Sequence, residues 1–266
     1  MKRFTGMFLL FGAAAFGAAP RVVSLSPATT ELVFHLGGGD TLVGRSRACD
    51  TPEAVKKLPV AGDFAAPDLE EIFRLRADCV VTNDLVAPRA AEALQSRGVD
   101  VLLLPCRNVA DYLDAVERLG ERLGRQEEAT REKARVLAAL EKGRNSPRCG
   151  WRVLMILWQK PVVVAGEKTF CSELIRLSGA ENVDFRGKSG YFTPDAEYLL
   201  RSDPDFILVF RDAGALKKHP VLKRLRAVRE NRVAELADES LFQRPGPRWI
   251  DAMEFLREIW KKNEKK

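Results

Sequence analysis

The sequence of 266 residues has only two histidines, His35 and His219, and its five cysteines include no CxxC pair. Closely spaced cysteines and histidines are the usual ligands of structural zinc, and CxxC is the usual redox motif, so neither kind of site is predicted. The cysteines are widely spaced, at positions 49, 79, 106, 149 and 171. Their odd number leaves at least one thiol outside any intramolecular disulfide, and the sequence does not determine the pairing.

Catalytic signatures are also missing. No G-x-S-x-G segment is present to place a nucleophilic serine on a sharp strand–helix turn, and there is no HExxH zinc motif. The three glycines at 37–39 follow a helical pattern and not a strand, so they predict a helix stop and not a phosphate loop. His35 lies in an apolar helical pattern and His219 in a basic loop, which leaves no evident base for a nucleophile. We therefore expect no enzyme.

Long apolar runs are absent beyond the N-terminus, where no stretch approaches the roughly 20 apolar residues that a membrane-spanning helix needs. Basic residues at positions 2 and 3 precede an apolar stretch at 4–16 and small residues at 17–19. This order predicts a secretory signal peptide over residues 1–19, with an N-terminal membrane anchor as the alternative. No cysteine follows the small residues, so we expect a soluble exported protein and not a lipoprotein.

Concentrated positive charge is missing as well. The formal net charge is +6, but lysines and arginines are scattered among acids, and the only dense basic run is the tail from Lys261 to Lys266. A nucleic-acid-binding protein would gather positive charge on one face, so the pattern predicts a solvated surface and no nucleic-acid partner. Nothing in the sequence indicates a stable oligomer, and we expect a monomer.

Short β-rich runs alternate with amphipathic helical patterns along most of the chain. Several of the expected strands are continuous apolar runs, which fits strands covered on both faces by helices. They lie at residues 22–26, 42–46, 79–83, 99–104, 152–158, 162–165, 206–210 and 233–236. The helical patterns between them include 30–36, 69–75, 88–96 and 196–201. This alternation predicts an α/β fold with parallel sheets.

One segment interrupts the alternation. Residues 109–142 contain no proline, their only glycines are Gly120 and Gly124, and their apolar residues follow a helical period. Thirty-odd helical residues would span roughly 50 Å, about the length of two domains. We predict two Rossmann-like lobes joined by one long backbone helix, with the lobes at 20–107 and 145–266 and the helix at 108–144. A pair of helices kinked at the two glycines is the alternative.

An internal repeat relates the lobes at an offset of 127 residues. Residues 67–78, PDLEEIFRLRAD, align with residues 194–205, PDAEYLLRSDPD, so that Pro, Asp, Glu, Arg and the final Asp recur in register. The same offset relates Phe64 to Tyr191. Each copy predicts a helix that opens with proline and carries acids in its first turn, where they interact favourably with the helix dipole.

The repeated residues allow a structural and a functional interpretation. Glu70 and Glu197 either stabilise two helix starts or present equivalent acids on one outer face to a two-sided basic partner. Phe64 and Tyr191 either pack locally before the helices or flank a ligand in the crevice where open α/β sheets bind their ligands.

Several segments of the sequence, taken in their order and spacing, resemble those of a known family. The segments are 21–31 (RVVSLSPATTE), 42–44 (LVG), 49–52 (CDTP), 60–62 (VAG), 67–78 and 244–248 (RPGPR). They resemble the helical-backbone class of periplasmic binding proteins, which serve ABC importers for cobalamin, haem and ferric siderophores. The last segment, followed by an amphipathic helix, is most similar to the cobalamin-binding branch.

The resemblance implies a periplasmic substrate-binding protein that captures a corrinoid between its lobes and delivers it to the permease dimer of an ABC importer. It implies no cofactor besides the bound ligand. It also implies that Glu70 and Glu197 dock onto arginines of the permease, where exposed charges steer association and set register. The same role for haem or a ferric siderophore, and an exported α/β hydrolase-like enzyme, are the alternatives.

For the ligand, the resemblance implies contacts from a residue before Asp50, from aromatic residues on facing loops and from the loop before the last helix. With Trp158 added as a strand-end residue that could equally belong to the core, the predicted set is Ala48, Phe64, Trp158, Tyr191, Ser240, Leu241, Phe242, Gln243 and Arg244. Ala48 and Leu241 stand where the cobalamin binder has aromatic residues, so a related corrinoid or another chelate stays open. Tyr191 is the candidate axial ligand for haem. Arg186, Arg244 or Arg248 could meet an anionic siderophore.

Overall fold

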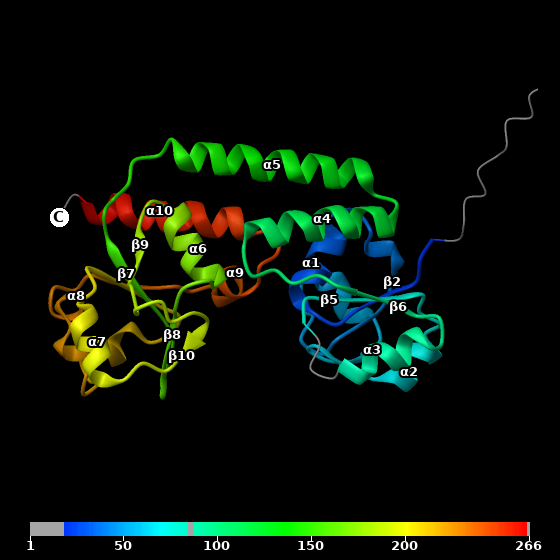
Figure 1. Ribbon diagram of the computed structural model, residues 1–266, viewed down its shortest axis with the longest axis horizontal. Helices are drawn as coiled ribbons and strands as arrows, with labels where there is room; N and C mark the ends of the chain where they lie inside the picture. Colours follow the sequence, from blue (N-terminus) through cyan, green and yellow to red (C-terminus); the bar gives the residue numbers. More distant parts are fainter. Residues whose placement is uncertain (1–18, 85–87, 265–266) are drawn as a thin grey trace, which may run out of the picture.

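The computed structural model describes residues 19–84 and 88–264, so the predicted signal peptide lies outside the described residues except for its last position. Two α/β lobes lie side by side, and helix α5 (Gln126–Arg144) extends along both of them (Figure 1). The two-lobed α/β class predicted from the sequence is confirmed. In the described part of the chain, no helix is both long enough and apolar enough to cross a membrane.

The first lobe is built on a parallel sheet of four strands in the order β2-β1-β5-β6. The strands are β1 (Val22–Ser24), β2 (Leu42–Arg45), β5 (Cys79–Thr82) and β6 (Asp100–Leu103). Every residue of β1 and β5 is buried, as their apolar runs predicted. The other elements are α1 (Pro27–His35), α2 (Leu69–Arg74), α3 (Pro88–Gln95), two 3₁₀ turns (Gly39–Thr41 and Glu53–Lys57) and the short pair β3 (Gly62–Asp63) and β4 (Ala66–Pro67).

The second lobe has a mixed sheet in the order β10-β8-β7-β11-β12, with β9 beside β7. Its strands are β7 (Arg152–Gln159), β8 (Val162–Ala165), β9 (Glu181–Asn182), β10 (Tyr191–Phe192), β11 (Phe206–Val209) and β12 (Val233–Glu235). Strands β7, β11 and β12 run parallel, whereas β8 turns back antiparallel to β7. The helices are α6 (Phe170–Leu177), α7 (Ala196–Ser202), α8 (Arg226–Arg229), α9 (Glu239–Gln243) and α10 (Trp249–Glu264), with 3₁₀ turns at Ala213–Lys217 and Leu222–Arg224.

The segment predicted as one bridging helix, residues 108–144, consists of two helices, and its extent is corrected here. Helix α4 (Val109–Leu123) ends at Gly124, whose left-handed conformation (φ 67°) closes the helix, and α5 runs back alongside it. The alternative of a pair of helices is therefore the observed one. The chain reverses its direction at Gly124 and is not merely kinked there. With 19 residues, α5 is about 28 Å long and is the helix that joins the lobes.

The lobes share one hydrophobic core. A single apolar cluster contains Val22 and Cys79 of the first sheet, Tyr112 of α4, Met155 of the second sheet and Trp249 of α10. Each of these side chains is fully buried. Separate, smaller clusters lie in each lobe away from this shared one. The helical layer packs on both sheets at once. Moving one lobe against the other would therefore expose apolar surface to water, at a free-energy cost of about 25 cal/mol for each Å² exposed.

The contact between α4 and α5 predicts a stability change. A side chain at Gly120 would bring its Cβ to 2.5 Å from the Cβ of Ala129 on α5. Gly120→Val should therefore lower the free energy of unfolding by about 1–3 kcal/mol, as overpacking does. Urea unfolding measures this. Ala110→Val, at an exposed position of the same helix, is the control, and an equal loss in the two variants would contradict the contact.

Candidate functional site

A cleft between the lobes contains two adjoining hollows, of about 630 and 530 Å³. Phe64, Asn83, Gln243 and Pro245 line both, so the hollows are two parts of one site. The first two residues belong to the first lobe and the last two to the segment around the end of α9. The cleft is therefore built from both halves of the chain, and neither lobe alone would form it.

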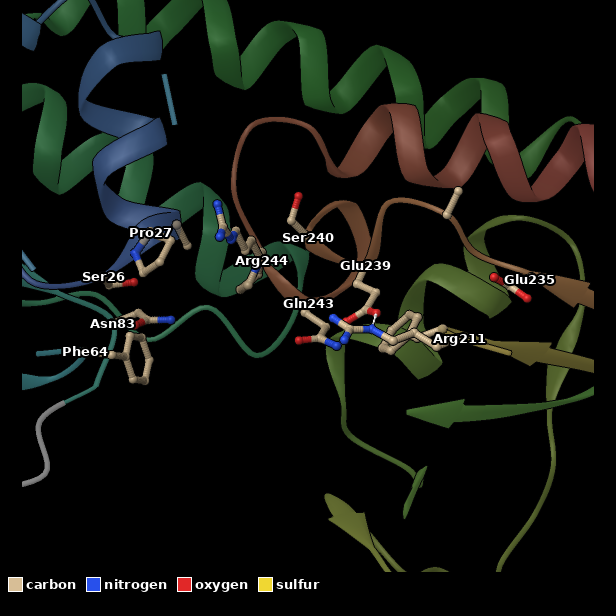
Figure 2. Close-up of a pocket in the computed structure, with 14 residues that line it drawn as sticks. Ser26, Pro27, Phe64, Asn83, Arg211, Glu235, Glu239, Ser240, Gln243 and Arg244 are labelled. Atoms are coloured by element: carbon tan, nitrogen blue, oxygen red, sulfur yellow. Dashed lines mark hydrogen bonds and ion pairs between the residues drawn. The ribbon is translucent and has the colours of Figure 1, made fainter. Parts of the chain in front are cut away.

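The cleft lies at the carboxyl ends of the parallel strands. The residues that follow these strands and line it are Ser26 after β1, Asn83 after β5, Pro105 after β6, Arg211 after β11 and Ala237 after β12. Open α/β sheets bind ligands at this edge because the loops there leave a crevice between helices. In Figure 2, Ser26, Phe64 and Asn83 lie on one side of the gap, and Arg211 and Glu239 on the other.

The two hollows differ in chemistry. The larger one is mostly polar and is lined by Ser26, Asn83, Arg211, Glu235, Glu239, Ser240, Gln243 and Arg244 together with a few apolar residues. The smaller one is more apolar and is lined by Phe64, Leu103, Pro105, Cys106, Phe170 and Tyr191, among others. A ligand that fills both would need an apolar face and a polar periphery.

Two arginines of the second lobe anchor it to the first. Arg244 donates to Oδ1 of Asp50 at 2.7 Å and to Oε1 of Glu31 at 3.3 Å, and Arg248 donates to Oε2 of Glu31 at 2.9 Å. The hydrogen bond from Arg244 holds the pKa of Asp50 below its ordinary value. Arg248 also pairs with Asp238 of its own lobe. These pairs fix the distance between the lobes beside the polar hollow.

A second polar cluster ties α5 to the same region. Glu132 of α5 is 3 % exposed and accepts hydrogen bonds from Tyr112, from Arg135 and, at 2.7 Å, shares one with His35 of α1. Burial raises the pKa of Glu132, but these hydrogen bonds outweigh it and lower the pKa to about 2. Arg135 also donates to the carbonyl oxygen of Pro247 at 2.6 Å. The cluster thus holds the segment that carries Arg244 and Arg248.

The two aromatic residues of the repeat both reach the cleft. Phe64 is 45 % exposed and Tyr191 is 50 % exposed, each from its own lobe. The Tyr191 hydroxyl lies 3.6 Å from Sγ of the buried Cys171, and burial raises the pKa of this phenol. Tyr191 therefore offers its ring to the cleft while its oxygen is engaged with the lobe interior.

The structure places the predicted ligand-binding residues unevenly. Those that line the hollows are Phe64, Tyr191, Ser240, Gln243 and Arg244. Ala48 and Trp158 are exposed outside both hollows, and Leu241 is half-buried against the shared core. Trp158, at 56 % exposed, is not a core residue either.

Phe242 is a correction to the predicted set. Its side chain is 1 % exposed and packs against Phe210 and Phe255. In the short helix α9 its neighbour Gln243 faces the cleft, so the side chain of Phe242 points into the core. It supports the cleft wall from behind and does not form its surface.

The predicted docking residues occupy equivalent positions in the two lobes. Glu70 lies in the first turn of α2, whose N-cap Asp68 accepts from the Glu71 N–H, and Glu197 lies in the first turn of α7. The N-cap of α7 is Asp195, which caps in the same way. Both glutamates are exposed, and α2 and α7 lie along the edge of the molecule opposite α5 (Figure 1).

Sequence reasoning missed five residues of the polar hollow: Ser26, Asn83, Arg211, Glu235 and Glu239. The first three end or directly follow predicted strands, so the rule that ligands bind at strand ends would have found them. Glu239 carries no such signal; in the structure it lines the hollow and pairs with Arg211.

No group of three or more histidine, cysteine or acidic side chains is arranged to hold a metal ion within residues 19–84 and 88–264. His35 is engaged with Glu132, and Nδ1 of His219 accepts from the N–H groups of Val221 and Leu222. Cys106 lines the apolar hollow, but burial raises its pKa to about 12, so it stays a thiol at neutral pH.

Comparison with known proteins agrees with this architecture. The sequence model of the family described as "Periplasmic binding protein" matches residues 22–239, which include most of both lobes. The protein named "Vitamin B12-binding protein" from Vibrio vulnificus is 26 % identical to this chain over 278 residues, covering 100 % of this chain and 99 % of the relative.

Two solved structures have the same arrangement. The periplasmic vitamin B12-binding protein BtuF of Vibrio cholerae superimposes with a TM-score of 0.79 at 23 % identity, covering 93 % of this chain and 99 % of the other. The periplasmic haem-binding protein BhuT, solved with two haems, gives a TM-score of 0.83 at 25 % identity, covering 93 % and 100 %. Both ligand classes are thus represented on this fold.

The buried Glu132 predicts a pH dependence of stability. Because its pKa is lower in the folded state than in the unfolded chain, its contribution of up to about 3 kcal/mol is present above pH 4.5 and is lost as the pH falls toward 2. Urea unfolding across that range should show a shallower loss of stability in Glu132→Gln than in the wild type. Glu117→Gln removes an exposed partner of Lys133 and should keep the wild-type slope. Identical slopes for all three proteins would refute this role.

Proposed function

Because the chain belongs to the periplasmic binding protein family, we propose that it is the exported substrate-binding component of an ABC importer and that its ligand is a corrinoid, cobalamin or a related one. The observation that carries this proposal is the composition of the cleft. Phe64 and Tyr191, one from each lobe, border a single apolar hollow that opens into a polar one. A corrin ring has apolar faces and polar arms, and it matches both.

Haem is the second candidate, and the similarity to BhuT favours it. A haem protein usually supplies an axial ligand to the iron. In the cleft the candidates are Tyr191, whose hydroxyl is turned toward Cys171, and Cys106, which stays protonated. A corrinoid can be held by ring contacts and hydrogen bonds alone, so the cleft favours a corrinoid over haem.

A ferric siderophore fits less well. Of the three arginines that could meet its negative charge, Arg244 and Arg248 already pair with Glu31 and with Asp50 or Asp238, and Arg186 lines neither hollow. Binding an anion there would require breaking pairs between the lobes. A neutral macrocycle leaves these pairs in place.

The placement of Glu70 and Glu197 supports delivery to a permease. Two exposed acids in equivalent first turns, one in each lobe, suit a permease dimer that presents a basic group on each half. The spacing of the two acids is held by the shared core and by the Glu31 ion pairs. We therefore expect a rigid docking surface that changes little on ligand binding.

Substitution of Tyr191 distinguishes the ligand candidates. Titration of the wild-type protein with cyanocobalamin, followed by tryptophan fluorescence, should give sub-micromolar affinity, which is tighter than about −8 kcal/mol. Tyr191→Phe keeps the ring and should bind within about threefold of the wild type, whereas Tyr191→Ala should bind at least about tenfold more weakly. Tight haemin binding that Tyr191→Phe abolishes, with no corrinoid binding, would establish haem instead.

Charge reversal tests the docking surface. The double variant Glu70→Lys and Glu197→Lys should abolish transport through the cognate permease while ligand affinity stays unchanged, because like charges would then meet. Glu121→Lys with Glu127→Lys is the matched control, since these exposed acids lie on α4 and α5 and the net charge changes equally. Undiminished transport by the first variant would rule out the docking role.

A further inference from the structure

Helix α1 begins inside the cleft, and its N-cap is unusual. Ser26 precedes the helix, but its hydroxyl does not cap the first turn, its side chain is 0 % exposed, and Oγ has no hydrogen-bond partner. A serine at this position normally accepts from a backbone N–H of the first turn. Asp68, Asn108, Thr169 and Asp195 do so at the starts of α2, α4, α6 and α7.

The first turn of α1 therefore keeps its own donors free. Pro27 has no N–H, and among the described residues nothing accepts from the N–H groups of Ala28 and Thr29. These groups form the positive end of a nine-residue helix. Ser26, Pro27 and Ala28 all line the polar hollow, so of these two donors the Ala28 N–H belongs to a lining residue.

A free acceptor lies beside these donors. Oδ1 of Asn83 is buried and has no hydrogen-bond partner. Asn83 follows β5, the neighbour of β1 in the sheet, and it lines the same hollow as Ser26. Figure 2 shows Ser26 and Asn83 next to each other on the first-lobe side of the hollow. Buried polar atoms without partners are rare in folded proteins, and two in one cavity point to a ligand.

The charge balance of the hollow selects the kind of group. Arg211 pairs with Glu239, and Arg244 pairs with Asp50 and Glu31, so no arginine of the lining is left for an anion. Unpaired donors next to an unpaired acceptor, with both lining arginines already paired, match a neutral group that both accepts and donates.

We propose that Ser26, the first turn of α1 and Asn83 form a subsite for a primary carboxamide of the ligand. The carboxamide oxygen accepts from the Ser26 hydroxyl and the Ala28 N–H, and its NH₂ group donates to Oδ1 of Asn83. This inference rests on the proposed function, because a corrin ring carries such carboxamides on its periphery. It assigns the recognition of the ligand's arms to the first lobe.

Stability of the free protein provides the first test. Since the Ser26 hydroxyl has no partner, Ser26→Ala should shift the melting temperature by less than about 1 °C. Thr169→Ala removes a hydroxyl that accepts a hydrogen bond from the first turn of α6, so it should lower the melting temperature by about 2–4 °C. A drop of about 2–4 °C in Ser26→Ala would mean that the hydroxyl stabilises the folded protein, and would overturn the proposal.

Binding provides the second test, with two corrinoids that share a ring. Dicyanocobinamide carries carboxamide arms, and dicyanocobyrinic acid carries free carboxylates at the same positions. The wild type should bind the amide form at least about tenfold more tightly at pH 7. Ser26→Ala and Asn83→Ala should each weaken binding of the amide form about three- to tenfold and leave the acid form within twofold.

The outcomes separate this inference from the proposed function. Equal affinity of the wild type for the two corrinoids, or unchanged affinity in both variants, would show that the hollow holds only water there, while corrinoid capture would stand. If the wild type binds neither corrinoid, the proposed function fails, and the subsite fails with it. Ser96→Ala changes an exposed serine on the surface of the first lobe. It is the control for effects of serine substitution outside the cleft.

Discussion

Glu31 of the first lobe is buried between two arginines, Arg244 and Arg248, of the segment that joins α9 to α10. A carboxylate removed from water is costly unless it is paired and hydrogen-bonded, and here both partners come from the other lobe. Removing both arginines would leave Glu31 buried at the lobe interface without a charged partner. The position of the second lobe, and with it the width of the cleft, depends on this contact.

The rest of the structure reinforces this constraint. Arg135 of helix α5 donates a hydrogen bond to the carbonyl oxygen of Pro247 in the same segment. The helical layer also gives both sheets a common hydrophobic core. A cleft held in this way exists before the ligand arrives. Binding then requires little ordering of the chain, which improves affinity, and the edge that carries α2 and α7 keeps its spacing for the proposed docking. In the proposed function, rigidity serves both capture and delivery.

Particular elements show how far sequence reasoning reached. The strands were predictable because buried parallel strands are continuous apolar runs, and the repeat identified Phe64, Tyr191, Glu70 and Glu197 as equivalent pairs. The two-residue strands β3, β4, β9 and β10 are too short to carry a periodic signal. The reversal between α4 and α5 was missed because a helical period continues on both sides of Gly124. Contacts between the two helices, such as Gly120 on Ala129 and Tyr112 with Glu132, decide the direction of the second helix.

By itself, the sequence determined the α/β class and the two lobes, since these depend on local apolar patterns and on a repeat in the chain. Only the tertiary structure decided which side chains face the cleft. Phe242 and Gln243 are adjacent in sequence, yet one lies in the core and the other in the site. Glu31 and Arg244 meet across more than 200 residues, and Ser26 lacks a partner only because of the neighbours the fold gives it. Such facts depend on contacts between distant segments, which no local pattern encodes.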